Sequence, residues 1–298
     1  FEDKNNLNFK NNIYLATVSR VEPSLQAAFV DFGRERHGFL AFNDIQSDYY
    51  QLPSEDKEKI RIAEEKIRED LKDKTVEINQ DSTEVVITEQ KGEKSQIFEE
   101  HSDNIDKKQD YREKIKTSYG IKKYKIQEVI KPGQLVLIQV IKEERGQKGA
   151  ALTTFISLAG KYIVLMPNTP KGGGISRKIF NSSDRQKIRS ILNEINIPKS
   201  MGAIVRTAGA NKTKNEIDKD FQNTLKTWEQ IKEKALSSNA PSLVYEEGDI
   251  IKRTIRDTYD NNTKNVYVEG NEAYQKAKKF MKELIPKNVK NIKKYRGK

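Results

Sequence analysis

Apolar and polar residues alternate with a period of two over three short runs between residues 12 and 42. The runs are NIYLATVSRVE, SLQAAFVDFG and RHGFLAF, and turn-forming residues separate them, first Glu22-Pro23-Ser24 and then Gly33-Arg34-Glu35. The alternation resumes in QLVLIQVIKEE at 134–144 and in AALTTFIS at 150–157. Such alternation predicts half-buried β-strands, and five strands in this arrangement predict a small closed barrel of the OB type.

A charged segment, residues 46–125, interrupts this predicted barrel between its third and fourth strands. Behind Pro53-Ser54-Glu55-Asp56, apolar residues recur at the spacing of an amphipathic helix with a capped start: Ile60, Ala63, Ile67 and Leu71. The rest of the segment is rich in Lys, Glu, Asp and Gln. A solvated insertion is favoured over a segment that contacts RNA or a partner protein.

Helical and strand patterns mix after residue 157. A helix is predicted near 184–192, and the clearest helical pattern runs from 215 to 236. Its apolar residues share one face, which makes Trp228 a core residue rather than a ligand contact: Ile217, Phe221, Leu225, Trp228 and Ala235. From 241 onward strand, helix, strand and helix alternate (SLVYEE, DIIKRTIRDTY, TKNVYVEG, NEAYQKAKKFMKELI), which predicts an α/β unit whose partner strands must come from elsewhere.

Composition narrows the class of protein. The 298 residues suffice for two domains. A formal net charge of +11 favours a polyanionic partner such as nucleic acid, although a basic surface that serves only solubility would give the same net charge. The absence of cysteine excludes disulfides, thiolate metal sites and cysteine nucleophiles, and makes the cytoplasm the expected compartment. The sequence shows neither a membrane-spanning run nor a signal peptide. Because it starts at Phe1 without a Met, it is expected to be a fragment.

The second and third strands carry the first candidate binding residues. Alternation places Phe29 and Asp31 on the face opposite Ala28 and Val30, with Phe39 on the neighbouring strand. On the outer face of an OB barrel, aromatic rings stack single-stranded bases at about 1–3 kcal/mol per base. Nearby cations would follow the nucleic-acid backbone: Arg34, Arg36, Lys142, Arg145 and Lys148. A barrel in which both phenylalanines are core fits the pattern equally well.

Two glycine-rich segments place cations beside flexible backbone, KGGGISRK at 171–178 and VRTAG at 205–209. Backbone N–H groups and a guanidinium can converge on a phosphate there, yet ordinary glycine turns are favoured on pattern alone, since neither is a Walker loop. The two histidines, His37 and His101, are not in metal-ligand spacing, and Asp31 is alone in its strand. The pattern therefore predicts binding surfaces, and no catalytic or metal site in this chain.

Several long strings together resemble the N-terminal half of a bacterial endoribonuclease of the ribonuclease E/G family: VEPSLQAAFVDFGRERHGFL, KEERGQKGAALTTFISLAGKYIVLMPN, GGISRKI, MGAIVRTAG and LKTWEQI. The long insertion favours the E branch over the G branch. The resemblance implies a mixed α+β and α/β chain divided into four parts. These are a remnant of a ribonuclease-H-like subdomain (1–11), an S-one-type OB RNA-binding domain (12–157, with the insertion at 46–125), a 5′-sensor subdomain (158–240) and a partial ribonuclease-H-like subdomain (241–298).

The resemblance also implies roles for individual residues. The single-strand RNA contacts of the barrel fall on Phe29, Phe39 and Lys148. The pocket for an RNA 5′ monophosphate falls on six positions, of which Arg206 and Thr207 would grip the phosphate: Gly160, Val164, Arg177, Lys178, Arg206 and Thr207. Lys178 stands where a second arginine is common in the family, so the positive charge is kept but bidentate binding is lost there.

The implied whole protein is a magnesium-dependent, single-strand-specific endoribonuclease of rRNA processing and mRNA turnover. Its catalytic aspartates, a structural zinc site and the segment that binds degradosome partners are expected beyond Lys298, so this chain should bind 5′-monophosphorylated RNA without cutting it. The full-length protein is expected to be a homo-oligomer of the bacterial cytoplasm, with inner-membrane association. The alternative is a non-catalytic OB-fold RNA-binding protein of translation or transcription.

Overall fold

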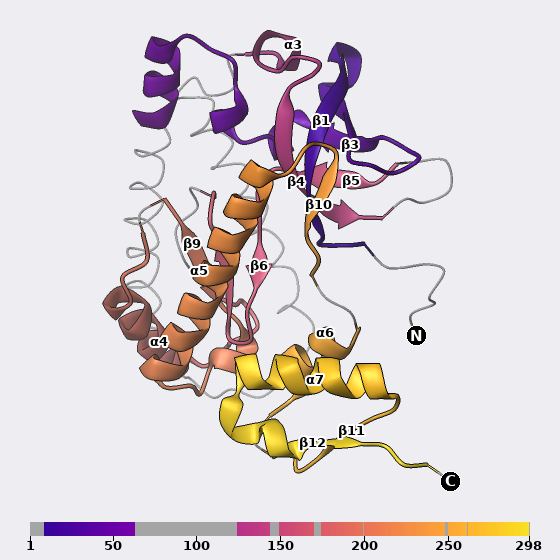
Figure 1. Cartoon of the computed structure of the whole chain (residues 1–298). Helices are drawn as coiled ribbons and strands as arrows, with labels where there is room; N and C mark the ends of the chain where they lie inside the picture. The colour runs from indigo at the N-terminus through magenta and orange to yellow at the C-terminus, as the bar shows by residue number, and fades with distance from the viewer. Residues whose placement is uncertain are drawn as a thin grey trace, which may run out of the picture.

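The computed structural model describes residues 9–62, 124–143, 149–169, 174–198, 200–247, 250–260 and 262–297. These residues form a β-barrel, then a smaller sheet with a long helix along it, and then a unit with two helices that ends near the C-terminus (Figure 1). Each part has its own cluster of buried residues. None of the described helices is long and apolar enough to cross a bilayer.

The first part is the barrel that the alternation predicts. Its strands are β1 (Ile13–Glu22), β2 (Ala27–Asp31), β3 (Gly38–Ala41), β4 (Leu135–Lys142) and β5 (Ala151–Thr153). They follow the order β1-β2-β3-β5-β4, and antiparallel pairing of β1 with β4 closes the sheet. Ala28, Val30 and Leu40 are fully buried in its interior, because alternate residues of each strand point inward. The predicted closed barrel of five strands is confirmed.

One further strand, β10 (Ser242–Tyr245), extends the barrel sheet. The sequence-based division assigned this strand to the last part of the chain, whereas it pairs antiparallel with the start of β1, with Ile13 opposite Tyr245. The reason is a free edge. β1 pairs with β2 only from Thr17 onward, so its first residues offer unpaired backbone groups on that side.

Part of the predicted 46–125 insertion packs against the barrel. A short 3₁₀ turn, η3 (Ser47–Tyr49), precedes a helix that begins at residue 54 and is described as far as 62. Tyr50 and Ile60 are buried in the barrel core, together with Ile126 of α3 (Ile126–Val129). The predicted start of the amphipathic helix is confirmed, while Ala63, Ile67 and Leu71 lie outside the described residues.

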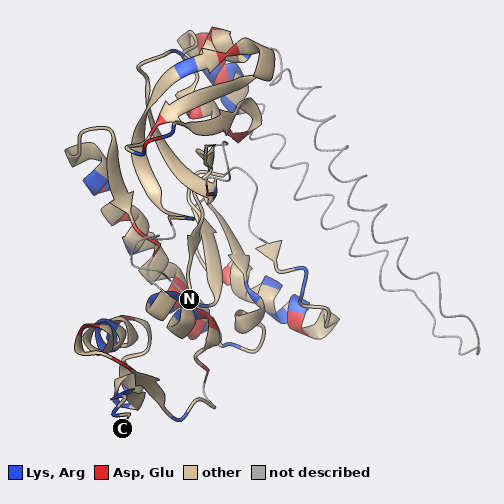
Figure 2. Cartoon of the chain, turned by 90° about the vertical axis from the view of Figure 1, so that its right-hand side faces the viewer, with Lys and Arg blue, Asp and Glu red and all other residues tan. Residues whose placement is uncertain are grey.

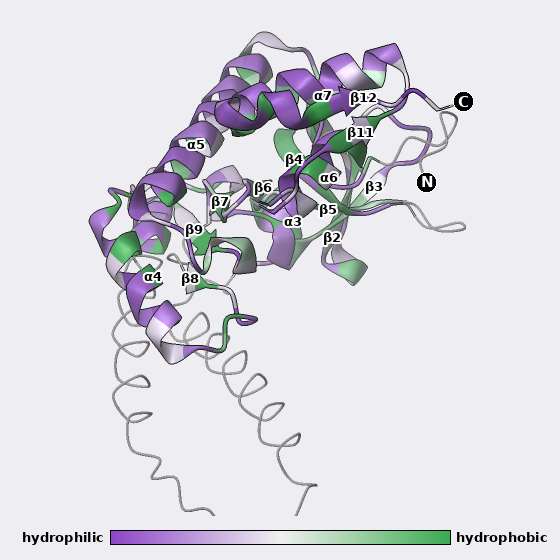
Figure 3. Ribbon diagram, turned by 90° about the horizontal axis from the view of Figure 1, so that it is seen from below, coloured by the Kyte–Doolittle hydropathy of each residue, from purple (hydrophilic) through white to green (hydrophobic). Residues whose placement is uncertain are grey.

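The second part is a small sheet, ordered β6-β7-β9-β8, that packs on helix α5 (Lys214–Ser237). The strands are β6 (Leu158–Ala159), β7 (Ile163–Met166), β8 (Gly174–Ile175) and β9 (Gly202–Val205), and α4 (Ser182–Glu194) contacts β8. Trp228 is 8% exposed and lies in the shared core, as predicted. The view from below shows α5 as largely hydrophilic and β9 as hydrophobic, as expected for a helix that buries one face only (Figure 3).

The third part contains the predicted tail elements. They are α6 (Ile250–Thr258), β11 (Val266–Val268) and α7 (Asn271–Leu284), followed by an unpredicted strand, β12 (Ile292–Lys294). β11 pairs in parallel with β12, so one partner strand comes from the tail itself, whereas the sequence pattern placed all partners elsewhere. α7 and the 3₁₀ segment η7 (Pro286–Asn291) provide the crossover that a parallel pair needs.

Candidate functional site

One edge of the small sheet gathers the residues predicted for the phosphate pocket. β8 runs parallel to β9, and Ser176 N donates to Val205 O at 2.9 Å, so Arg177 and Arg206 follow neighbouring strands at the same edge. β7 is antiparallel to β9, which brings the residues before β7, including Gly160, to this edge as well. The side chains of Arg177, Lys178 and Thr207 are exposed. Val164 lies further along β7, opposite Ile204.

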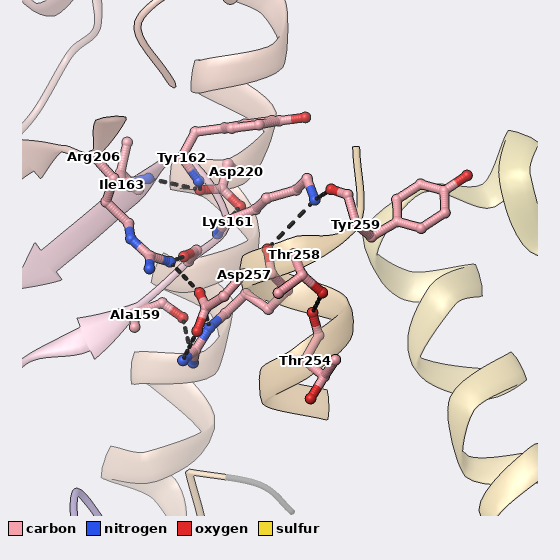
Figure 4. Close-up of polar contacts among 12 residues, drawn as sticks. Ala159, Lys161, Tyr162, Ile163, Arg206, Asp220, Thr254, Asp257, Thr258 and Tyr259 are labelled. Carbon is pink, nitrogen blue, oxygen red and sulfur yellow. Dashed lines mark hydrogen bonds and ion pairs between the residues drawn. The ribbon is translucent and has the colours of Figure 1, made fainter. Parts of the chain in front are cut away.

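The Arg206 guanidinium is held by one of its nitrogens. Nη1 donates to the carbonyl of Gly160 at 2.8 Å and lies 2.7 Å from Oδ1 of Asp257 in α6. In the part of the chain that the structure describes, Nε and Nη2 have no hydrogen-bond partner, and the side chain is 28% exposed. Figure 4 shows the guanidinium facing the Asp257 carboxylate. The Nε–Nη2 edge is the side-on fork that binds the oxygens of a phosphate in pairs.

Asp220 of α5 fixes the backbone beside Arg206. Its carboxylate accepts hydrogen bonds from the N–H groups of Lys161 (3.0 Å), Tyr162 (2.8 Å) and Ile163 (3.0 Å). Burial raises the pKa of Asp220, although these N–H donors oppose the rise. A Cβ on Gly160 would lie 2.5 Å from Oδ2 of Asp220, so only glycine fits there. The sequence analysis missed Asp220, although an acid on the buried face of α5, beside Phe221, is a signal that could have found it.

Replacing Asp220 by alanine should lower the free energy of unfolding by about 3 kcal/mol, because three backbone N–H groups would lose their acceptor at a buried site. Chemical denaturation followed by circular dichroism measures this. Glu229→Ala is the matched control, since Glu229 is an exposed acid of the same helix. A loss no larger than that of the control would show that Asp220 does not hold this turn.

Helix α6 is tied to the same edge by charged groups that the sequence did not single out. Lys161 is buried and donates from Nζ to the carbonyl of Tyr259 at 2.5 Å, just after the end of α6. Arg256 donates from Nε and Nη2 to the two oxygens of Asp257 at 3.1 and 3.2 Å, and its Nη1 pairs with Glu247. Glu247, Arg256, Asp257 and Arg206 thus form a row of alternating charge that ends at the open fork of Arg206.

The outer face of the barrel carries the second group of predicted residues. Phe29 and Phe39 are half-buried and lie opposite each other on β2 and β3, with ring centroids 6.0 Å apart in an edge-to-face arrangement. Neither belongs to the barrel core, so the interpretation of both as core residues is wrong. The exposed Arg20 of β1 lies opposite Phe29, with its guanidinium carbon 4.4 Å from the ring centroid. Lys148 and Arg145 lie outside the described residues.

The charge distribution alone does not mark a binding surface. Lys and Arg positions are spread over the barrel, the helices beside the small sheet and the C-terminal unit, with acidic positions among them (Figure 2). Among the described residues, no three His, Asp or Glu side chains gather as metal ligands. The candidate RNA contacts are instead the two groups of residues described above, at the edge of the small sheet and on the aromatic face of the barrel.

Comparison with known proteins identifies the family. Residues 157–298 match the Ribonuclease E/G family. The chain belongs to this family. It is 34% identical over 288 residues to the ribonuclease E of Haemophilus influenzae, which covers 97% of this chain and 24% of that protein. Identity to the ribonuclease E of Escherichia coli is also 34%, over 289 residues, 97% of this chain and 21% of that protein.

A putative ribonuclease E from Buchnera aphidicola subsp. Baizongia pistaciae is 32% identical over 272 residues, 91% of this chain and 50% of that protein. The chain thus spans about a quarter or less of the first two relatives and half of the third. The names of these relatives support the predicted E branch of the ribonuclease E/G family over the G branch.

Proposed function

We propose that this chain is the RNA-binding and 5′-monophosphate-sensing part of a single-strand-specific endoribonuclease. The observation that carries the proposal is the Arg206 guanidinium, which is held through Nη1 while its Nε–Nη2 fork has no partner among the described residues and the side chain is 28% exposed. The Thr207 side chain follows directly and is exposed, and Arg177 and Lys178 add positive charge at the same edge of the sheet. This is a set of donors for a small dianion.

Such a set of donors discriminates by chemistry at the RNA 5′ end. A terminal monophosphate supplies oxygens for the arginine fork and for the Thr207 hydroxyl. A 5′ hydroxyl supplies none of these contacts, and a triphosphate adds bulk and charge that a site for one phosphate excludes. Bases further along the strand would stack on Phe29 and Phe39, where Arg20 already lies over one ring.

We assign the cleavage chemistry to the longer protein. Magnesium supplies charge stabilisation at a scissile phosphodiester when it is bound, and among the described residues no three His, Asp or Glu side chains gather as candidate ligands for it or for zinc. From the resemblance to the family, we propose that the ligands of both metals, the oligomer contacts and the degradosome partners belong to other parts of the longer protein. The activity we propose for the longer protein is rRNA processing and mRNA turnover in the bacterial cytoplasm, with inner-membrane association.

The direct test compares short single-stranded RNAs of one sequence that carry a 3′ fluorophore and either a 5′ monophosphate or a 5′ hydroxyl. Fluorescence anisotropy should show that the monophosphate RNA binds about 10- to 100-fold more tightly, since charge-assisted hydrogen bonds contribute ~1.5–3 kcal/mol each. Tight, salt-sensitive and equal binding of the two RNAs would instead favour the alternative, a non-catalytic OB-fold RNA-binding protein of translation or transcription.

A further inference from the structure

Asp257 lies between two arginines at the junction of α6 and the small sheet. Its Oδ1 is 2.7 Å from Nη1 of Arg206, and Arg256 binds both of its oxygens through Nε and Nη2. Arg256 is in turn paired with Glu247, which is almost fully buried. Four side chains of alternating charge therefore form a row. Figure 4 shows the end of this row that lies at the small sheet.

This arrangement constrains the Arg206 side chain at a single atom. Nη1 is held by acceptors from two different elements, the carbonyl of Gly160 before β7 and the carboxylate of Asp257 in α6. Because the guanidinium is planar and rigid, two acceptors on Nη1 fix the plane and the direction of the opposite fork. The fork is left for a ligand. An arginine without these contacts would have to give up side-chain rotamer entropy when it bound a phosphate.

Asp257 shares its negative charge between two arginines, because Arg256 binds both of its oxygens and Arg206 lies at Oδ1. Burial raises the pKa of Asp257, but hydrogen bonds from Arg256 and Arg206 outweigh burial and leave this pKa below its usual range. The carboxylate therefore stays ionised at neutral pH. The bidentate contact with Arg256 also fixes the orientation of the carboxylate, so that Oδ1 is presented to Arg206.

We propose that Asp257 is a positioning residue for 5′-phosphate recognition: it holds Arg206 through Nη1 so that the Nε–Nη2 fork is set for the phosphate before RNA arrives. This inference rests on the proposed function of the sheet edge. It adds that the affinity for the phosphate depends on a residue of α6 that does not touch the ligand.

The test uses the whole chain with Asp257→Ala and Asp257→Asn, and Glu269→Ala as the control that removes an exposed acid from the same C-terminal unit. Anisotropy with the two RNAs should show a preference for the monophosphate that falls roughly fivefold in Asp257→Ala, because Arg206 must then be ordered on binding. Affinity for the 5′-hydroxyl RNA should stay at the wild-type value. The asparagine variant keeps one acceptor oxygen and should lose less, and Glu269→Ala should lose nothing.

A second readout does not involve RNA. Nitrogen-15 NMR of the arginine side chains, assigned through Arg206→Lys, should show slow rotation of the Arg206 guanidinium in the wild type and fast rotation in Asp257→Ala. Tighter monophosphate binding in Asp257→Ala would overturn the proposal and make Asp257 a competitor. An unchanged preference, or equal weakening with both RNAs together with a lower melting temperature, would overturn it too.

The two hypotheses fail in different ways. If the wild type bound both RNAs equally, the proposed function would fail, whereas the NMR experiment would still decide whether Asp257 holds Arg206. If the wild type preferred the monophosphate and the guanidinium rotated freely both with and without Asp257, only the positioning role would fail.

Discussion

Replacing Arg206 by alanine is expected to abolish the preference for 5′-monophosphorylated RNA and to leave the affinity for 5′-hydroxyl RNA nearly unchanged. The loss should be about 2 kcal/mol, or roughly 30-fold in the affinity for the monophosphate RNA, because the fork of charge-assisted donors is removed. The fold should tolerate the change. Asp257 keeps its bidentate contact with Arg256, and Gly160 is not fully buried, so no buried charge is left without a partner.

Anisotropy with the two RNAs, at one salt concentration, measures this effect. Arg61→Ala is the matched control, since Arg61 is an exposed arginine whose ion pair is with Glu58 on its own helix. Arg206→Lys separates charge from geometry: lysine keeps the charge but not the planar fork, so its preference should fall between those of wild type and alanine. If Arg206→Ala and Arg61→Ala weakened both RNAs to the same extent, Arg206 would contribute only general electrostatic attraction.

The barrel and the long helix could be predicted because their signals are local. In β2 the alternation of Ala28, Phe29 and Val30 matches the observed burial residue by residue. In α5 the spacing of Ile217, Phe221 and Trp228 matches the buried face. Each pattern reports which side of its own element is apolar, and this suffices to place an element in a core.

Pairing between distant segments could not be predicted in the same way. β10 joins β1 because β2 leaves the first residues of β1 unpaired, and β11 finds its partner in β12 after the chain has crossed over through α7. Both strand pairings depend on which strand of the folded protein has unpaired backbone groups along its edge. A period of two in the sequence marks a strand but does not say which edge it will meet.

In the candidate site, too, some residues could be predicted from the sequence and others, which depend on long-range contacts, could not. The resemblance placed Gly160, Arg177 and Arg206 in one pocket, and the structure brings all three to one sheet edge. The residues that hold them were missed. Asp257 lies in a polar helix where an acid beside an arginine is unremarkable in the sequence, and its contact with Arg206 spans 51 positions, from 206 to 257. Asp257, which orients Arg206, carries no local pattern of its own, whereas Asp220 stands out as an acid on the buried face of α5.

Removing both barrel phenylalanines, Phe29→Ala with Phe39→Ala, is expected to weaken single-stranded RNA binding by about 2–4 kcal/mol, or roughly 30- to 1000-fold, because each base stack is worth ~1–3 kcal/mol. Both rings lie outside the barrel core, so the protein should stay folded, with a loss of ~1 kcal/mol for their edge-to-face contact. Thermal unfolding checks this, and Tyr267→Ala, an aromatic that is 60% exposed on β11, is the control.

The double variant should weaken the monophosphate and hydroxyl RNAs by the same factor, because the stacking rings and the phosphate fork act on different parts of the strand and their effects should add. The slope of affinity against salt should also stay at the wild-type value, since stacking releases no counterions, whereas loss of a phosphate contact lowers that slope. RNA binding equal to that of Tyr267→Ala would mean that Phe29 and Phe39 only pack against each other. The RNA surface of the barrel would then have to lie on another face.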